Sequence, residues 1–592
     1  MLISKNLRVN PSTNNIARAS DEQPWREEPL LNLARVAAAL AFGVALVFCW
    51  RAAEMRPTAL FEPGTAAALW AFIRGLFPPD FSLDFLGVVS AAIIRTAALA
   101  IAGTTLAIVI GLPLGVMSTS TLWQRGVLLA GEPPGVRKFA LAWLSRGCRE
   151  LLGFLRAVPD LMWGLLFVVA VGLGPLAGTL ALGVSYGGVL GRVYADVFED
   201  VDSRALEALH ATGATHTQVF LRAIWPQAKP SIVAYTLYLL ECCARSASVL
   251  GFIGAGGIGY EINLSMRLFE YGQVLTLIVA LVGLVAVTDF FSRYLRRRLH
   301  ANVPAGSLAH QHIADEPSLR SHEDRRARAT LLIFIAVVAA SFFVTGFFTG
   351  TRAGLLTRIV RFSGEMFPPD LDPAFLRLLA VPLVQTIGIS VMGTLIGIAI
   401  GAVLSLPATS TLAFAGEDDA GGPSLLNRAL RAFVYCAARL GLNLLRSIPE
   451  LVWVLMCIVA VGLGPFAGTL AIGLHTGGVL GKLYAETLEE VPARPVEALR
   501  ASGARPLQIL LWGIWPQARP MLVSYTVLRW EMNIRVSTIL GLVGGGGLGQ
   551  AIYNNVQLGF YSRTTTIVAI VYALVIVMDW LGDRLRNRRT AI

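Results

Sequence analysis

The sequence repeats itself at a fixed distance of 290 residues, and this repeat limits what the chain can fold into. The motif Phe-Pro-Pro-Asp at 77–80 returns at 367–370, and the stretch 159–200 returns at 449–490 with more than half of its positions identical. The offset does not change along the chain, so no net insertion separates the two copies. We therefore expect one structural module, duplicated in tandem and fused.

Each copy carries about six apolar segments, which predicts a membrane protein. The segments cover 33–50, 89–116, 160–174, 176–194, 231–252 and 274–292 in the first copy, and 330–349, 380–404, 450–464, 466–482, 521–542 and 564–581 in the second. Only 15% of the residues are charged and 55% are hydrophobic, which leaves too few charges to coat several soluble domains. A helix needs about 20 residues to cross the hydrocarbon core. The short third segment is therefore either tilted or extended by the amphipathic stretch before it.

The placement of arginine predicts how the chain is oriented in the membrane. Arginines crowd the linker between the copies, follow the last apolar segment, and lie between the second and third segments. Positive side chains collect on the cytoplasmic side of a membrane, so both termini and the linker are predicted to lie inside. The net charge of +11 is then no sign of nucleic-acid binding. Each copy crosses the membrane an even number of times, and the copies run parallel.

These observations predict an all-α integral membrane protein of about twelve transmembrane helices, built as two parallel-related six-helix repeats. The predicted parts are a cytoplasmic tail at 1–30, a first module at 31–295, a cytoplasmic linker at 296–328 and a second module at 329–592.

A short loop between the fourth and fifth segments has the same pattern in both copies. Each loop has a glutamate, an alanine, a glycine six residues after the glutamate, and a later proline at the start of the next segment. These residues are Glu207, Ala208, Gly213 and Pro226 in the first copy, and Glu497, Ala498, Gly503 and Pro516 in the second. Alanine and leucine favour a short helix, and glycine is a natural place for it to end. The topology predicts that both helices lie on the cytoplasmic face.

The fifth segment of each copy carries charges and then a run of glycines. The charges are Glu241 and Arg245, and Glu531 and Arg535, each pair spaced i to i+4 on one helix face. Charges within a membrane are expensive and are paired or line a polar path. The pairs are either self-neutralising structural pairs or part of a pathway in which the arginines help an anion across. Candidate pathway residues also include Asn533 and the glycines Gly254, Gly257, Gly259, Gly544, Gly547 and Gly549.

The glycine runs, at the outer end of the fifth segment, indicate a broken helix or a re-entrant turn, with close packing of small residues as the plainer interpretation. Asp289 and Asp579, near the inner end of the sixth segment, are interpreted as structural residues at the membrane interface.

The loop pattern resembles the Glu-Ala-Ala loop of ABC-importer permeases, which docks as a coupling helix on an ATPase subunit. The fifth segment, together with Arg-x-x-Pro-[Asp/Glu]-Leu and Val-Gly-Leu-Gly-Pro before it, is similar to phosphonate-importer permeases over about 70–300 and 360–590. Two departures stand out. Where the family tends to have Ile-x-Leu-Pro, both copies have a small residue followed by Ile-Trp-Pro. Where the family tends to have Asn-Ile, the first copy has Cys242-Cys243-Ala244.

The resemblance implies the fold of type I ABC-importer permeases and a function in import. The chain would move phosphonate or a related small phosphorus oxyanion into the cytoplasm by alternating access in a bacterial inner membrane. It implies two copies of an ABC ATPase subunit that bind ATP and magnesium, and a periplasmic or lipid-anchored solute-binding protein. Membrane lipids are the remaining expected partner, and nucleic acid is not expected to bind. The alternatives are an ion-coupled secondary transporter built from parallel repeats, or an ABC permease for another small solute such as methionine.

Catalytic and metal chemistry is not expected of this chain. The sequence has no G-x-x-x-x-G-K-[ST] phosphate loop and no acid/base or nucleophile constellation, so ATP hydrolysis is assigned to partners and no cofactor to the chain. The histidines His210, His216 and His475 are isolated in the sequence, and no metal site is predicted.

Overall fold

The computed structural model describes residues 33–123, 136–301, 332–350, 354–414 and 425–587, and their regular secondary structure is entirely helical. The chain divides into two compact units, Met1–Phe48 and Cys49–Ile592. The first unit holds most of α1 (Leu33–Ala52). The second unit contains the remaining helices of both copies and all the candidate site residues. The predicted tail 1–30 and most of the predicted linker 296–328 lie outside the described residues.

The helices of the two copies follow one another in the same order. The first copy contains α2 (Pro63–Gly75), α3 (Leu83–Ser118), α4 (Ser120–Trp123), α5 (Val136–Ala157), α6 (Asp160–Val171), α7 (Pro175–Glu199), α8 (Ser203–Ala211), α9 (His216–Val219), α10 (Trp225–Leu250), α11 (Ile258–Arg267) and α12 (Tyr271–Ala301). The second contains α14 (Phe347–Gly350), α15 (Leu355–Met366), α16 (Pro373–Ser405), α17 (Ser410–Ala413), α18 (Leu425–Ser447), α19 (Glu450–Val461), α20 (Pro465–Glu489), α21 (Ala493–Ala501), α22 (Pro506–Gln508), α23 (Trp515–Leu540), α24 (Gly547–Gln557) and α25 (Tyr561–Asn587).

The predicted apolar segments correspond to helices, and several further helices lie outside them, including the amphipathic α5 and α18. The short helices α2 and α15 precede the second segment of each copy, and α11 and α24 follow the fifth. α12 continues to Ala301, past the predicted end of the first module at 295. The predicted domain boundaries are otherwise not tested by the fold and stay predictions.

Six helices in the described part of the chain are long and apolar enough to cross a membrane, and nine spans result if each bent pair counts as one. Two further apolar helices, Leu40–Ala52 and Leu332–Val344, are shorter, and the 25-residue α20 is not among these spans. α20 is the copy of the span α7 and begins, like it, with proline at its first position, where a helix needs no N–H donor.

The third segment of each copy is a short helix joined to its neighbour at a sharp bend. The axes of α5 and α6 meet at 90°, and those of α18 and α19 at 97°. Pro159 and Pro449 stand at the bends, where proline disfavours a helical residue before it. The amphipathic stretch is thus continuous with the third segment in sequence but turns away from it in space, so it does not lengthen the segment as a straight helix.

Each copy is built around a close pair of helices, α3 on α7 and α16 on α20. The helices approach closely because glycines face each other. A Cβ on Gly111 would lie 2.9 Å from the backbone of Gly187 and Gly191. Small residues at helix crossings are typical of membrane proteins, where van der Waals packing replaces the hydrophobic effect.

The two copies exchange their short helices. α2 of the first copy packs on α19 of the second, and α15 of the second packs on α6 of the first. Phe362 of α15 joins Leu166 and Ala170 of α6 in one buried cluster. Phe154 of α5 and Tyr572 of α25 add an edge-to-face ring contact of 5.2 Å between the copies.

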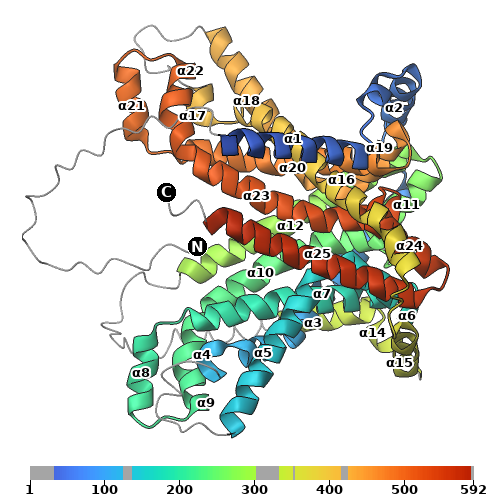
Figure 1. The fold of residues 1–592 in the computed structure, drawn as a ribbon, viewed down its shortest axis with the longest axis vertical. Coiled ribbons are helices and arrows are strands. Elements are labelled where there is room, and N and C mark those ends of the chain that lie inside the picture. Colours follow the sequence, from blue (N-terminus) through green and yellow to red (C-terminus); the bar gives the residue numbers. More distant parts are fainter. Residues whose placement is uncertain (1–32, 124–135, 302–331, 351–353, 415–424, 588–592) are drawn as a thin grey trace, which may run out of the picture. The chain divides into compact units, whose positions relative to one another are not determined.

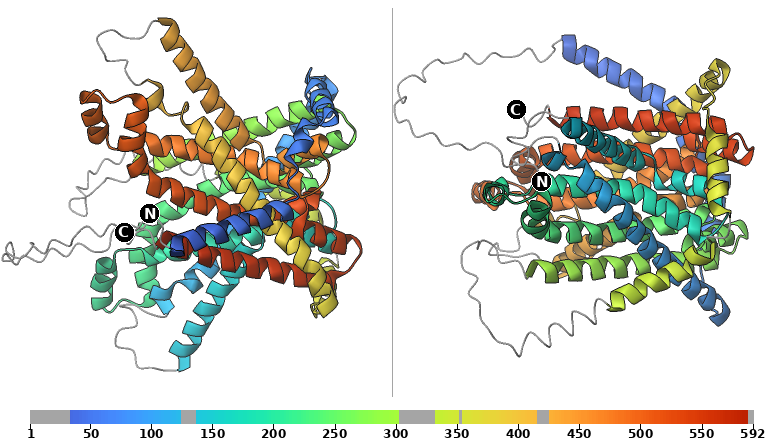
Figure 2. Two further views of the ribbon diagram at one scale, coloured as in Figure 1. Left: turned by 45° about the horizontal axis from the view of Figure 1, so that its top comes forward. Right: turned by 90° about the horizontal axis from the view of Figure 1, so that it is seen from below.

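Repeated features gather at opposite ends of the second unit (Figures 1 and 2). α8 and α21 lie at one end, the left in Figure 1, and we call it the loop end. α11 and α24 lie at the other end, which we call the glycine end. The duplicated loops therefore face the same side, as parallel repeats require.

Candidate functional site

The duplicated loops fold into short exposed helices. The side chains of Glu207 and Ala208 on α8, and of Glu497 and Ala498 on α21, are exposed. Each helix ends at a glycine with positive φ, +80° at Gly213 and +78° at Gly503, the left-handed conformation that terminates helices. Pro226 and Pro516 are the second residues of α10 and α23, but these helices continue directly from the π-helical stretches Phe220–Ile224 and Ile509–Ile514, so the prolines do not start a separate helix as expected.

The two loops differ in the apolar surface beside them. In the second copy Leu507 is 65% exposed and Trp512 is 76% exposed. The equivalent residues of the first copy are Thr217 and Arg222, and Leu221 is 57% exposed there, so the second loop offers the larger apolar surface.

The glycine runs separate two helices in each copy. α10 and α23 each end in a single 3-10 turn and are followed by α11 and α24, and the second-copy pair is bent by 42°. Gly254 and Gly544 adopt φ of +98° and +96°. A Cβ on Gly259 would collide with the carbonyl oxygen of Ser248, and one on Gly549 with that of Thr538. Close backbone packing thus accounts for these glycines.

Glu241 and Arg245 form the predicted ion pair on α10. Arg245 Nη2 donates to Glu241 Oε1 at 2.6 Å, and Arg296 Nη2 on α12 lies 3.8 Å from Glu241 Oε2. The Glu241 side chain is only 11% exposed, so the carboxylate is held between two arginines in a largely dehydrated place.

The equivalent pair of the second copy is arranged differently. Arg535 Nη2 lies 3.6 Å from Glu531 Oε1 but donates to Asp579 Oδ1 at 2.7 Å. Asp579 Oδ2 also accepts from Arg156 Nη2 of the first copy at 3.2 Å. Asp579, interpreted from the sequence as structural, therefore connects α23 and α25 to the bend of α5 in the other copy.

Asn533, a candidate pathway residue, is buried among helices of its own copy. Its amide nitrogen donates to Thr394 Oγ1 at 2.8 Å, and its amide oxygen accepts from Thr476 Oγ1 at 3.1 Å. Because both amide groups are bonded and the residue is 1% exposed, this geometry ties α16, α20 and α23 together.

Sequence reasoning missed a charged cluster of Glu450, His475 and Arg529. Glu450 Oε1 lies 3.1 Å from His475 Nε2 and 3.4 Å from Arg529 Nη2. His475 Nδ1 lies 3.0 Å from the carbonyl oxygen of Ile448. The side chains of His475 and Arg529 are 9% and 13% exposed. The prediction that His475 is isolated is wrong, because Glu450 follows the bend before α19 and reaches it from another helix.

The first copy holds a different set at the same positions. Asp160 replaces Glu450, Ser185 replaces His475 and Leu239 replaces Arg529. Asp160 is close enough to Glu450 to repel it electrostatically, and Arg245 is close enough to act on Glu450, His475 and Arg529. These replacements, visible at the 290-residue shift, were the signal that could have found the cluster.

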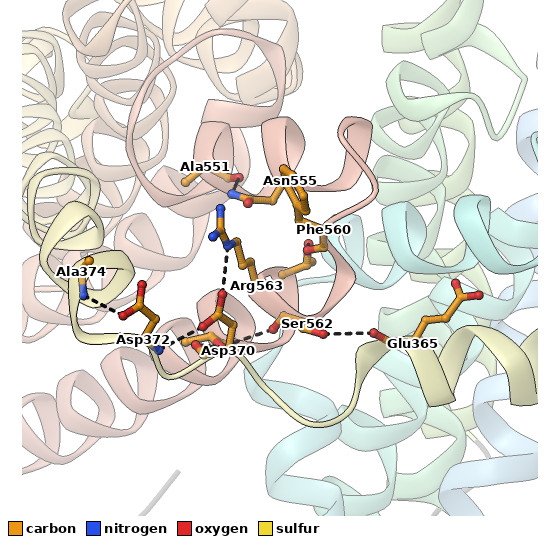
Figure 3. A network of polar contacts seen from close by, with 11 residues as sticks. Glu365, Asp370, Asp372, Ala374, Ala551, Asn555, Phe560, Ser562 and Arg563 are labelled. Atoms are coloured by element: carbon orange, nitrogen blue, oxygen red, sulfur yellow. Dashed lines mark hydrogen bonds and ion pairs between the residues drawn. The ribbon is translucent and has the colours of Figure 1, made fainter.

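At the glycine end, Asp80 and Asp370 hold the loops of the Phe-Pro-Pro-Asp motifs. The pKa of Asp370 lies below its usual range because the backbone N–H of Asp372 donates to it and Arg563 Nε donates at 3.0 Å. The pKa of Asp80 is lowered mainly by the backbone N–H of Ser82. Figure 3 shows the second-copy network, beside a cavity of about 460 Å³. The cavity is lined by Glu365, Asp370, Gly559, Phe560, Tyr561, Ser562 and Arg563.

Metal binding finds no support among the described residues, where no three His, Cys, Asp or Glu side chains gather to hold an ion. The expectation that the chain binds no metal stays a prediction.

The chain matches a known family at both copies. Residues 126–301 and 420–591 match the family described as "Binding-protein-dependent transport system inner membrane component". The chain is 30% identical over 551 residues to a phosphate-import permease of Mycolicibacterium smegmatis, covering 92% of each protein. It is 34% identical over 265 residues to a phosphite transport system permease of Stutzerimonas stutzeri, covering 44% of this chain and 89% of that protein.

A solved structure of a methionine ABC transporter in an inward-facing conformation is also similar, with 24% identity and a TM-score of 0.32 over 37% of this chain and 99% of that chain.

The chain belongs to the family of ABC-importer permeases and is a multi-pass inner-membrane transport component. It carries two permease modules, because the family match occurs twice while the phosphite relative spans one copy. The ion-coupled alternative is thereby set aside.

Proposed function

We propose that this chain is the complete permease of an ABC importer, which moves a small phosphorus oxyanion into the cytoplasm by alternating access. The observation that carries the proposal is the pair of exposed helices α8 and α21 at one end of the molecule, each closed by a glycine in the left-handed conformation. Two such helices suit two ATPase subunits, one on each helix.

The partners follow from this arrangement. ATP and magnesium would bind to the two ATPase copies, because the chain has no phosphate loop. A periplasmic or lipid-anchored solute-binding protein would deliver the anion to the opposite end. The chain itself would hold no cofactor and catalyse no reaction.

The orientation follows from the same proposal. The loop end would face the bacterial cytoplasm, and both termini would lie inside. The arginine-rich segments that follow α12 and α25 fit this orientation, since positive side chains stay on the cytoplasmic side.

The substrate class is proposed from the relatives, whose names state phosphate import and phosphite transport. Phosphonate, phosphite and phosphate share a tetrahedral phosphorus with two or more anionic oxygens, so one permease path suits all three. Methionine is the second candidate, because a probable D-methionine permease of Vibrio cholerae is 34% identical over 28% of this chain.

Binding to the ATPase tests the role of the loops. Ala498→Glu on exposed α21 should lower copurification of the ATPase subunit, because it places an unpaired charge in the docking surface. Gln557→Glu at the glycine end introduces the same side chain far from the loops and is the control. Equal copurification with both variants, or no ATPase bound to the unmodified chain, would overturn the coupling role.

Uptake tests the substrate. Proteoliposomes containing the permease, its ATPase and the binding protein should accumulate phosphate, phosphite or methylphosphonate with ATP and not without it. Accumulation of methionine alone would favour the second candidate, and uptake that persists without ATP would contradict the importer.

A further inference from the structure

In the cluster of Glu450, His475 and Arg529, the histidine and the arginine lie near the middle of α20 and α23, and Glu450 begins α19. Glu450 begins the 12-residue α19, so it lies roughly 18 Å from the glycine end of that helix at 1.5 Å per residue. Arg529 is 14 residues after the start of α23, roughly 21 Å from the loop end. A charged side chain at this depth is costly unless it is paired or takes part in function, so it is by default a candidate functional residue.

The hydrogen bonds of His475 fix part of its protonation. The carbonyl oxygen of Ile448 only accepts, so Nδ1 carries a proton toward it. Nε2 faces a carboxylate oxygen, so the pair shares a second proton and is either an imidazolium with a carboxylate or an imidazole with a carboxylic acid. In both forms a single oxygen of Glu450 is the partner of both His475 and Arg529.

The donors of the arginines around this cluster are not all used. Arg529 Nε and Arg245 Nε are buried without a hydrogen-bond partner among the described residues. The Nε donors of Arg149, Arg446 and Arg535 are unpaired in the same way, so the geometry of the cluster, and not this feature alone, marks the site. Arg245 comes from the first copy, so positive charge from both copies acts on this place.

Among the described residues, the acidic groups near this place include Glu450, Asp160, Glu241 and Asp289. Glu241 is bonded to Arg245, and Asp160 Oδ1 accepts from the backbone N–H of Leu161 at 2.9 Å. Glu450 is therefore the carboxylate that neutralises the positive charge of Arg529.

We propose that Arg529 and His475 form the contact site for the phosphorus oxyanion during its passage, and that the anion replaces Glu450 as their partner, while Arg245 adds positive charge from the first copy. A tetrahedral oxyanion offers several oxygens to the forked donors of arginine, where Glu450 offers a single oxygen at 3.1 and 3.4 Å. The site is asymmetric, because the first copy has Leu239 and Ser185 at the equivalent positions. This inference rests on the proposed function.

The chain supplies matched variants for the test. Arg529→Leu places in the second copy the residue that the first copy has at that position. Arg361→Ala is the control. It also introduces the residue that the first copy has at the equivalent position, but on α15, at an arginine that is 82% exposed and paired with Glu365. The double variant Glu450→Gln/Arg529→Leu removes both charges, so that no unpaired carboxylate is left to disturb folding.

The measurement is the initial uptake rate in proteoliposomes, for whichever of phosphate, phosphite and methylphosphonate the unmodified complex transports fastest, alongside its ATP hydrolysis. Arg529→Leu and the double variant should both reduce uptake at least about tenfold, the effect of losing one charge-assisted hydrogen bond, while ATP hydrolysis is kept. Arg361→Ala should leave uptake unchanged. Arg529→Lys, which keeps the charge without the fork, should raise KM for the anion.

Recovery of uptake in the double variant would overturn the proposal, because a purely structural ion pair is repaired when both partners are removed. Unchanged KM in Arg529→Lys would do the same. A complex whose unmodified form takes up none of the three anions would overturn the proposed function itself, which is a different result.

Discussion

The two copies are alike in their helices and unlike in the charged residues near the middle of the molecule. The bends at Pro159 and Pro449 and the glycine turns before α11 and α24 are repeated almost residue for residue. Glu450, His475 and Arg529, in contrast, correspond to Asp160, Ser185 and Leu239 in the first copy. Residues that determine the backbone were kept through the duplication, and the residues that would meet a transported anion diverged.

A second difference separates the copies at the loop end. The backbone of α8 and α21 is the same, including the glycines that end them, but the exposed side chains of Leu507 and Trp512 beside α21 have no apolar counterpart beside α8. Two equivalent ATPase subunits would therefore meet two unequal surfaces.

The largest expected effect tests the part that the copies share. Gly259→Ala and Gly549→Ala should each destabilise the permease by more than about 3 kcal/mol, because the new Cβ collides with a backbone carbonyl that cannot move aside. The yield of folded protein by size-exclusion chromatography measures this. Gly283→Ala on α12, where a Cβ meets nothing within 4 Å, is the control. A large loss in only one copy would break the equivalence of the two turns.

A smaller effect tests the contact between the copies. Asp579→Asn should lower stability by about 1–2 kcal/mol, because it weakens the bonds to Arg535 and Arg156 in a partly buried place. Thermal unfolding of the purified protein reports it. Asp289→Asn, the same change in the first copy, should cost less, since Asp289 Oδ1 has no hydrogen-bond partner among the described residues. Equal losses would show that the two aspartates contribute equally to stability.

A third test concerns the unequal loops. Trp512→Arg gives the second loop the residue of the first and should weaken ATPase binding roughly tenfold, because an exposed aromatic anchor is lost. Titration of the ATPase against the immobilised permease measures the affinity. Arg222→Trp in the first loop is the reciprocal variant and should strengthen binding there. No change in either would place Trp512 outside the docking surface.

The smallest effect is expected at the glycine end. Asp370→Asn should lower stability slightly and Asp80→Asn less, because only Asp370 is bonded to an arginine. A carboxylate with a lowered pKa contributes stability above its ordinary pKa and loses it as the pH falls through the lowered value. Unfolding curves of Asp370→Asn and the unmodified protein should therefore converge only in strong acid. A difference that persists there would point to a role other than charge.

Much of the fold could be predicted from the sequence because membrane helices are long apolar runs and the repeat supplied each run twice. The ends of the short loop helices could also be read, since Gly213 and Gly503 mark them by residue type. The right-angle bends could not be predicted, because an amphipathic stretch followed by an apolar one does not show the angle between the two helices. The cluster at Glu450 was missed for the same reason: its three members lie far apart in the sequence and meet only after α19, α20 and α23 pack together.

The exchange of α2 and α15 between the copies has a consequence for how the permease is made. Two separate half-length chains could pair like with like, and a pair of second halves would carry two copies of the Glu450 cluster and no Asp160. A covalent tether raises the effective concentration of the correct partner to about the millimolar range. The fusion therefore ensures that every permease molecule contains one half of each kind. The asymmetry between the halves is then encoded in one chain and does not depend on which separate halves associate.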